Sequence, residues 1–314
     1  MDFNIVDFGE VQRDLDDHGV ATNFNTSFHT AEQAPDLPIP HNSPYAFGRW
    51  LPVILRSRDL PASALQIVSL SRRQVGVLVR AAAASVHTRV LNRAYAEDLQ
   101  DEVAPAFAAL AFPPEGLFLR LDACSPKDGA QTSPGRVALH SVDEVLLRLT
   151  TSQRALSPLG NMLNGDAPEE RLYFLPYDAR MNPASEYRVF CVPGSLAVSA
   201  VSQYRWHQPW ALASAERNEM EARARTILAG ISVVHAQIVD SLREPGVSEV
   251  DDLARAQGFS FDVLYDRETE ACMLVELNTF GVRSACGSCL FHWLRDQEVL
   301  YGEASDNVEF RVAL

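Results

Sequence analysis

The sequence predicts an α+β fold in which antiparallel strands and helices share one chain. Residues 186–192 and 196–201 have strand patterns joined by a Pro193-Gly194 turn, and a second hairpin is predicted over 259–278. Residues 214–242 carry apolar side chains three or four positions apart, as an amphipathic helix does. Hydrophobic residues make up 47% of the 314-residue chain, which is enough for one large or two modest cores.

Composition and charge exclude several classes of protein. The formal net charge is −14, so the field of the whole molecule repels nucleic acids. Apolar runs are far shorter than the roughly 20 residues that cross a bilayer, and the acidic start lacks the features of a signal peptide. Among five scattered cysteines, only Cys286 and Cys289 have metal-ligand or redox spacing, and no second pair matches them. We expect a cytoplasmic protein that binds neither nucleic acid nor membranes.

The first third of the chain predicts little regular structure. Residues 1–44 are expected to form an irregular arm. Residues 21–44 hold four prolines and no sustained periodicity, so we expect no core there. Short apolar runs between 47 and 79 predict extended segments. Residues 91–110 predict a helix that Pro105 kinks or restarts.

A strand over 116–122 runs into a loop at 123–135 that is rich in turn-forming residues. Backbone N–H groups in such a loop can face a ligand. The loop also carries Lys127, the one lysine of the chain. We therefore expect this strand and loop to contribute to a binding site.

Downstream, helix and strand signals alternate. Ser141 and Glu144 have capping-box spacing ahead of an apolar run, which predicts a helix that ends near residue 153. A strand at 172–175 and the two strands of the first hairpin are expected to form an antiparallel meander.

The 259–278 hairpin carries the clearest chemical pattern. If residues 265 and 266 face Cys272 and its neighbour, Asp262 lies opposite Glu276, and Asn278 shares the face of Glu276. Two carboxylates and an amide oxygen in apolar strands are costly to bury unless a cation lies between them. Hard oxygen ligands suit Mg²⁺ held together with nucleotide phosphates. The alternative is that all three face solvent while the apolar residues form the buried face.

Six segments resemble, in the same order, motifs of the cell division cycle protein 123 family. They are FLRLDACSPKDG (118–129), EYRVF (186–190), VSQY (201–204), FDVLY (261–265), VELNTFG (275–281) and LFHW (290–293). The resemblance implies the ATP-grasp fold of that family, with two α/β lobes whose antiparallel sheets enclose a nucleotide cleft. The implied parts are an N-terminal lobe over 45–175 and a C-terminal lobe over 176–314, which contains the magnesium-binding hairpin.

The resemblance also implies individual site residues. The Mg²⁺ ligands of the family correspond to Asp262, Glu276 and Asn278. Arg188 and Lys127 are the implied catalytic cations, and adenine is expected beside residues 174–176. The implied ATP-binding residues are Arg120, Asp122, Ser125, Lys127, Asp128, Phe174, Leu175, Pro176, Glu186, Arg188 and Asp262.

Several of these residues also have a structural interpretation. Family members have a lysine at the position of Arg120 and an arginine in the loop of Lys127, so the two cations look exchanged. A surface ion pair is the alternative for the first, and a solvated loop lysine for the second. Asp128 can cap the loop instead of contacting ligand. Glu186 and Arg188 point the same way on their strand, where a cross-strand salt bridge is the alternative to a place near the nucleotide.

Two functions fit the resemblance. The known eukaryotic role of the family is a nucleotide-binding chaperone for assembly of translation initiation factor 2. This chain has Glu276-Leu-Asn278 where family members have Asp-Phe-Asn, and Glu-x-Asn resembles the metal motif of ATP-grasp ligases. We therefore favour an ATP-dependent ligase that joins a small-molecule carboxylate to an amine through an acyl phosphate, with chaperoning of a factor 2 subunit as the alternative. Replacing Asp262 or Glu276 with alanine is expected to abolish Mg-dependent ATP binding and to leave the fold intact.

Overall fold

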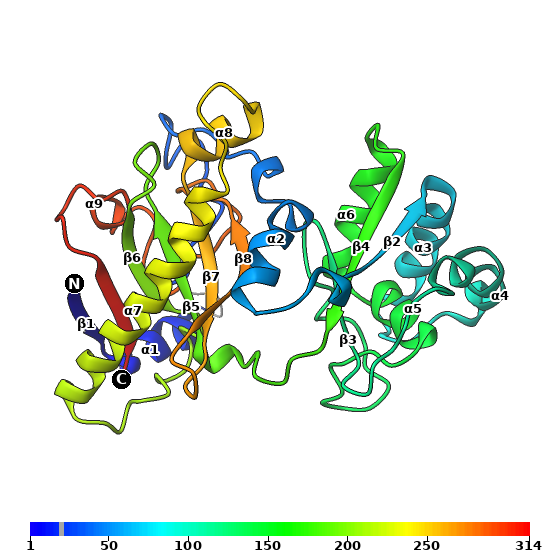
Figure 1. The fold of residues 1–314 in the computed structure, drawn as a ribbon, viewed down its shortest axis with the longest axis horizontal. Coiled ribbons are helices and arrows are strands. Elements are labelled where there is room, and N and C mark those ends of the chain that lie inside the picture. The colour runs from blue at the N-terminus through cyan, green and yellow to red at the C-terminus, as the bar shows by residue number, and fades with distance from the viewer. Residues whose placement is uncertain (19–21) are drawn as a thin grey trace. The chain divides into compact units, whose positions relative to one another are not determined.

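Strands from both ends of the chain meet in a six-stranded sheet in the computed structural model, which describes residues 1–18 and 22–314 (Figure 1). This sheet belongs to unit 1, which comprises residues 1–59 and 180–314, whereas residues 60–179 form unit 2 around a three-stranded sheet. Both units combine helices with a sheet, so the predicted α+β class is confirmed. None of the described helices has the length and hydropathy of a membrane span.

The sheet of unit 1 has the strand order β1-β9-β6-β5-β7-β8. The two predicted hairpins, β5–β6 and β7–β8, are antiparallel, whereas β1 and β9 pair in parallel. The strands are β1 (Asp2–Val6), β5 (Glu186–Cys191), β6 (Val198–Gln203), β7 (Phe259–Tyr265), β8 (Cys272–Asn278) and β9 (Glu309–Ala313).

Helix α7 (Arg217–Asp240) crosses one face of this sheet (Figure 1). It buries the apolar stripe that its sequence predicts: Ile227, Ile231, Val234 and Ile238. A second cluster packs Phe190 of β5 edge-on against Phe291 and Trp293 of the C-terminal loops. Unit 1 also contains α1 (Phe8–His18), α2 (Phe47–Ser57), α8 (Glu249–Gln257) and α9 (Gln297–Leu300).

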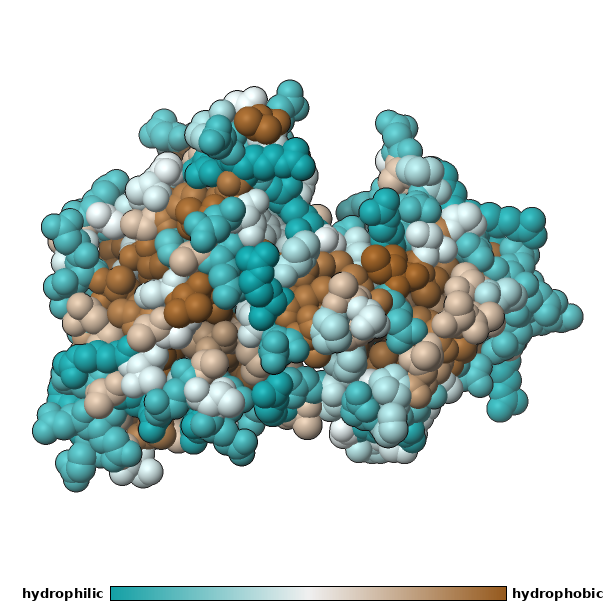
Figure 2. Space-filling view, in the orientation of Figure 1, coloured by the Kyte–Doolittle hydropathy of each residue, from teal (hydrophilic) through white to brown (hydrophobic). Residues whose placement is uncertain are grey.

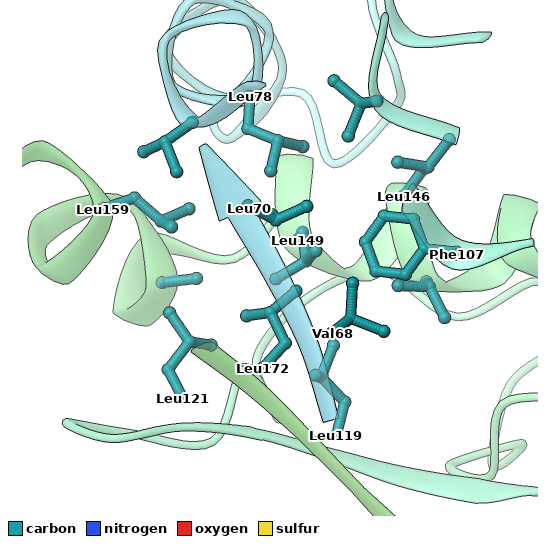
Figure 3. Packing of buried hydrophobic residues seen from close by; sticks show 14 of the residues in the cluster. Val68, Leu70, Leu78, Phe107, Leu119, Leu121, Leu146, Leu149, Leu159 and Leu172 are labelled. Carbon is teal, nitrogen blue, oxygen red and sulfur yellow. The ribbon is translucent and has the colours of Figure 1, made fainter. Parts of the chain in front are cut away.

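Unit 2 is built on the antiparallel order β2-β4-β3. Its strands are β2 (Gln66–Ser71), β3 (Leu117–Leu121) and β4 (Glu169–Pro176), and its helices include α3 (Arg72–Ser85), α4 (Ala96–Asp98), α5 (Val142–Thr150) and α6 (Gln153–Asn164). Figure 3 shows Leu78 of α3, Leu159 of α6 and Leu146 of α5 converging on the sheet residues Leu70 and Leu172. The side chains on one face of the three strands therefore belong to this core.

The predicted irregular arm over 1–44 is wrong for its first residues, which form β1 and α1. The prediction failed because β1 pairs with β9 at the far end of the chain, which no local pattern reveals. Residues 22–42 are largely irregular, but Ala34 is buried in the cluster around Phe190, so the expectation of no core there is also wrong.

Two apolar runs predicted as extended are helices. In α2 the buried residues Phe47, Trp50, Leu51 and Ile54 follow helical spacing. In α3 the start signal is a capping box, in which Ser71 Oγ accepts a hydrogen bond from Gln74 N and the Gln74 side chain accepts one from Ser71 N. Because α2 packs against β8, it belongs with unit 1, and the units part near residues 59 and 179 rather than at the predicted lobe limits of 45 and 175.

Two further predictions need correction. The strand at 172–175 is part of β4 in unit 2, so it does not continue into the β5–β6 hairpin as a meander. Instead of the single helix predicted over 91–110, the chain forms a series of short 3₁₀, α and π helical segments. The last 3₁₀ segment begins at Ala104, directly before Pro105. Pro105 therefore restarts the helical path as its missing N–H predicts.

Candidate functional site

Arg188 and Asp262 form a buried ion pair within the sheet of unit 1. Arg188 Nε donates to Asp262 Oδ1 at 2.8 Å, and Arg188 Nη2 donates to Oδ2 at 2.7 Å. Only 8% of the Arg188 side chain is exposed, and none of the Asp262 side chain. Burial alone lowers the pKa of Arg188, but the charge and hydrogen bonds of Asp262 raise it well above its usual value. Arg188 is therefore a fixed cation in a dry environment.

Strand register places this pair beside Glu276. Arg188 on β5 lies opposite Asp262 on β7, and Asp262 lies opposite Glu276 on β8. Near the turn, Tyr265 pairs with Cys272, and a β-bulge next to Asp262 then shifts the register by one residue. The predicted opposition of Asp262 and Glu276 is confirmed, and it depends on this bulge.

Asn278 completes the predicted trio. Its Nδ2 donates to Asp262 Oδ2 at 3.2 Å, and both Asn278 and Glu276 are half-buried. The alternative in which the trio faces solvent is wrong for Asp262, which is fully buried. Glu186 stands two residues before Arg188 on the same face of β5 and is half-buried as well.

The donor set of this cluster fits Mg²⁺ in part. Carboxylate and amide oxygens are its preferred ligands. A carboxylate offers about four lone-pair positions, and three hydrogen bonds to Asp262 come from Arg188 and Asn278. Glu276 and the amide oxygen of Asn278 are therefore the better candidates for direct metal ligands, and Asp262 chiefly ties Arg188 to them. The described residues contain no cluster of three His, Cys, Asp or Glu suited to a metal.

Two neighbours of Arg188 complete its surroundings. Arg188 Nη1 donates to the carbonyl oxygen of Gly287 at 2.7 Å, and the guanidinium carbon lies 5.1 Å from the Tyr204 ring centroid. Burial and the charge of Asp262 raise the pKa of Tyr204. Sequence reasoning did not assign either residue. Tyr204 lies in the VSQY segment that carried part of the resemblance, whereas Gly287 acts through its backbone and leaves no side-chain signal.

The loop that carries Gly287 is held by the N-terminal segment. Asn25 N donates to the Cys289 carbonyl at 2.7 Å, and Cys289 N donates to Asn25 Oδ1 at 3.1 Å. Phe28 N donates to the Ser284 carbonyl at 2.8 Å. Residues 22–28 therefore help to position Arg188 through this loop.

The cysteine pair in the same loop is unsuited to metal binding. All five cysteines are free thiols, and burial raises the pKa of Cys286 to about 11 and that of Cys289 further. Metal ligation and nucleophilic attack need the thiolate, which a raised pKa disfavours at neutral pH.

Unit 2 holds the predicted phosphate-binding strand and loop. Arg120 on β3 lies opposite Tyr173 on β4 and is buried, which excludes the exposed ion pair considered above. The Tyr173 hydroxyl donates to Asp122 Oδ2 at 3.2 Å. Residues 120 and 122 are two positions apart at the end of a strand, so the structure brings Arg120 and Asp122 to the face that also carries Tyr173.

The loop itself divides into structural and exposed residues. Asp128 accepts hydrogen bonds from Ser152 Oγ at 2.5 Å and from Arg154 N at 3.2 Å, so it caps the start of α6. This favours the capping alternative for Asp128. Ser125 is buried, whereas Lys127 is exposed and remains a predicted phosphate ligand.

The predicted adenine-binding segment is part of the core of unit 2. Phe174 is fully buried and packs edge-on against Phe107, with 6.2 Å between ring centroids. Phe174 shares a strand face with Leu172, and this face points into the core. The Phe174 side chain therefore cannot flank a base. Leu175 is also buried, and Pro176 is half-buried at the end of β4.

A pocket of about 360 Å³ opens beside Thr279, the residue after Asn278. Phe28 and Ile39 line this pocket, with 69% and 64% of their surfaces exposed. Arg283 also lines it and contributes a positive charge. Phe28 also has a φ of 53°, which costs a non-glycine residue free energy. Two exposed apolar side chains around an arginine are suited to an organic anion.

Solved structures with the same fold cover most of this chain. Cdc123 from Schizosaccharomyces pombe matches with a TM-score of 0.57 and 16% identity, over 92% of this chain and 100% of that one. The chain has the fold of Cdc123. A C-terminally truncated form of Cdc123 from the same organism matches with a TM-score of 0.56, again at 16% identity, over 91% of this chain and 99% of that one. No protein-family model and no curated protein matches the sequence. The resemblance that the six motifs indicated is thus confirmed at the level of the fold.

Proposed function

We propose that this protein is an ATP-grasp member of the cell division cycle protein 123 family that binds Mg-ATP and joins a carboxylate to an amine. The observation that carries the proposal is the cluster on β5, β7 and β8. Asp262 and Glu276 lie opposite each other on β7 and β8, and Asn278 donates a hydrogen bond to Asp262. Arg188 on β5 lies opposite Asp262 and donates to it. The Cdc123 fold, which is matched over 92% of this chain, supports the family.

Glu276 and Asn278 are the residues that would hold Mg²⁺, which when bound neutralises the charge of a transferring phosphoryl group. Asp262 positions Arg188 for the same task. A guanidinium has five N–H donors, and Arg188 uses three of them on Asp262 and Gly287. Two N–H donors of Arg188 are left for the oxygens of a ligand. The buried ion pair with Asp262 orients these donors before a ligand binds.

In the proposed reaction, a substrate carboxylate oxygen attacks the γ-phosphorus of ATP, and the bond from that phosphorus to ADP breaks. The amine nitrogen then attacks the acyl carbon of the resulting acyl phosphate, inorganic phosphate leaves and the nitrogen loses a proton. No protein nucleophile is required. The pocket beside Thr279, with Arg283 and the apolar rim of Phe28 and Ile39, supports a carboxylate with an apolar body as one substrate.

Product formation tests this proposal. The purified chain is incubated with Mg-ATP and pooled amino acids and small carboxylic acids, and the products are identified by mass spectrometry. We expect acceptor-dependent ADP formation and a condensed product mass. ATP binding without turnover in any pool would contradict the ligase and favour the chaperone of a translation initiation factor 2 subunit.

Two variants on one hairpin provide the control. Glu276→Gln removes a carboxylate charge from the cluster, whereas Glu268→Gln makes the same change in the exposed turn between β7 and β8. We expect only the first to abolish product formation. Equal loss in both variants would show that the hairpin is perturbed and not that a ligand is missing.

A further inference from the structure

A second pocket of unit 1 is lined by arginines. It has a volume of about 480 Å³ and lies between α2, the end of α7 and the start of α8. Arg49, Arg56 and Arg243 line it, together with the acidic residues Asp240 and Asp251. It shares no residue with the cluster around Asp262. The face that Figure 2 shows is mostly hydrophilic over α8.

One of the three arginines is already neutralised. Arg49 forms an ion pair with Asp251, whose side chain is 1% exposed. Asp251 Oδ2 also accepts a hydrogen bond from Arg243 N at 3.4 Å, and Asp251 N donates to Ser248 Oγ at 3.4 Å. Asp251 is thus committed to the structure, and of the described residues that line the pocket only Asp240 offers a further negative charge to Arg56 and Arg243.

The charges in this pocket are not fully compensated. Among the described residues, neither Arg56 nor Arg243 has an ion-pair partner, and the buried Nε of Arg49 has no hydrogen-bond partner. Burial and the nearby charge of Arg243 lower the pKa of Arg49, which shows that these guanidiniums repel each other. Such repulsion is unexpected in a chain with a net charge of −14. A bound anion would relieve it.

The ligand chemistry follows from the donors. Guanidinium groups bind phosphate oxygens through paired N–H donors, and Ser248, the N-cap residue of α8, adds a hydroxyl to the wall of the pocket. The pocket is larger than a phosphate ion, so it has space for the carbon skeleton that carries the group. We propose that this pocket binds the phosphate group of a small phosphate monoester through Arg56 and Arg243, beside the Arg49–Asp251 ion pair.

Binding of inorganic phosphate and of glycerol phosphate, measured by calorimetry without ATP and at constant ionic strength, tests the site. We expect both anions to bind and both Arg56→Gln and Arg243→Gln to weaken binding about tenfold or more. The control is Arg225→Gln on α7, which removes an exposed arginine that pairs with Glu221 and leaves the pocket unchanged. Tryptophan fluorescence checks that the variants are folded.

Two results would overturn the proposal. One is a binding heat that chloride at the same ionic strength also produces, because such a heat reports charge screening and not a specific phosphate site. The other is phosphate affinity that survives both Arg56→Gln and Arg243→Gln, which would place the anion elsewhere on the protein. Neither result depends on whether the chain is a ligase.

Discussion

Replacing Asp262 with alanine leaves Arg188 buried without its counter-ion, and we expect this to destabilise unit 1. Arg188 is 7% exposed and loses two charge-assisted hydrogen bonds, of 2.7 and 2.8 Å. Breaking a buried pair by removing one partner costs about 3–5 kcal/mol. This prediction replaces the expectation that Asp262→Ala leaves the fold intact. If it holds, a loss of ATP binding in that variant does not identify a metal ligand.

A double-mutant cycle measures the pair directly. Arg188→Met should cost a similar amount, because it removes the cation beside the fully buried Asp262. Arg188→Met combined with Asp262→Leu instead replaces the pair by apolar groups. We expect the double variant to be within about 1–2 kcal/mol of the wild type and the coupling energy to be at least about 3 kcal/mol. Arg217→Gln, which breaks the exposed Arg217–Glu221 pair, is the control and should change stability by less than about 0.5 kcal/mol.

Urea denaturation followed by tryptophan fluorescence reports on unit 1 alone, since all four tryptophans lie in its residue ranges. They are Trp50, Trp206, Trp210 and Trp293. If Asp262→Ala costs less than about 1 kcal/mol, or if the two single costs add in the double variant, the buried pair is not the structural centre that the geometry indicates.

Two further substitutions test the fold. Burial, reinforced by Asp122, raises the pKa of Glu170 to about 7 from 4.5, so the folded state binds this proton more tightly and unit 2 loses stability as pH rises through that interval. After allowance for solvent screening, Glu170→Gln should stabilise unit 2 by about 1–2 kcal/mol at pH 8 and hardly at pH 4. Thermal unfolding followed by circular dichroism measures this difference. An equal effect at both pH values would refute the raised pKa of Glu170. Gly258 has a φ of 68°, and an added Cβ would lie 2.5 Å from the Cys191 carbonyl oxygen, so Gly258→Ala should cost unit 1 about 2–4 kcal/mol. The control is Gly194→Ala, with a φ of 78° and no atom within 4 Å, which should cost only about 1–2 kcal/mol, and equal costs would show that the close contact is relieved.

Local patterns predicted the elements whose signals are strong and self-contained. The buried stripe of α7 follows helical spacing from Met220 to Ile238, and strands β7 and β8 flank one polar turn. The predicted opposition of Asp262 and Glu276 is confirmed because the bulge next to Asp262 supplies the one-residue offset that the predicted turn register contains. The ion pair between Arg188 and Asp262 corresponds to the cross-strand alternative for Arg188.

Other features depend on contacts that are distant in the sequence. Pairing of β1 with β9 joins the two ends of the chain, and the apolar runs of α2 and α3 were too short to separate helix from strand by periodicity. Phe174 alternates with Leu172 on β4, and this period of two places its side chain in the core and not beside a base. The pocket of Arg56 and Arg243 combines residues about 190 positions apart, so no motif marks it.

The most direct test of the central claim is calorimetry of ATP binding with and without Mg²⁺, on the wild type, Glu276→Gln and the turn control Glu268→Gln. We predict that removing Mg²⁺ weakens the wild type and Glu268→Gln at least about tenfold, or about 1.4 kcal/mol. We also predict that Glu276→Gln binds weakly under both conditions. Absence of ATP binding in the wild type, or a Glu276→Gln variant that keeps full Mg-dependent affinity, would contradict the assignment of this hairpin as a Mg-ATP site.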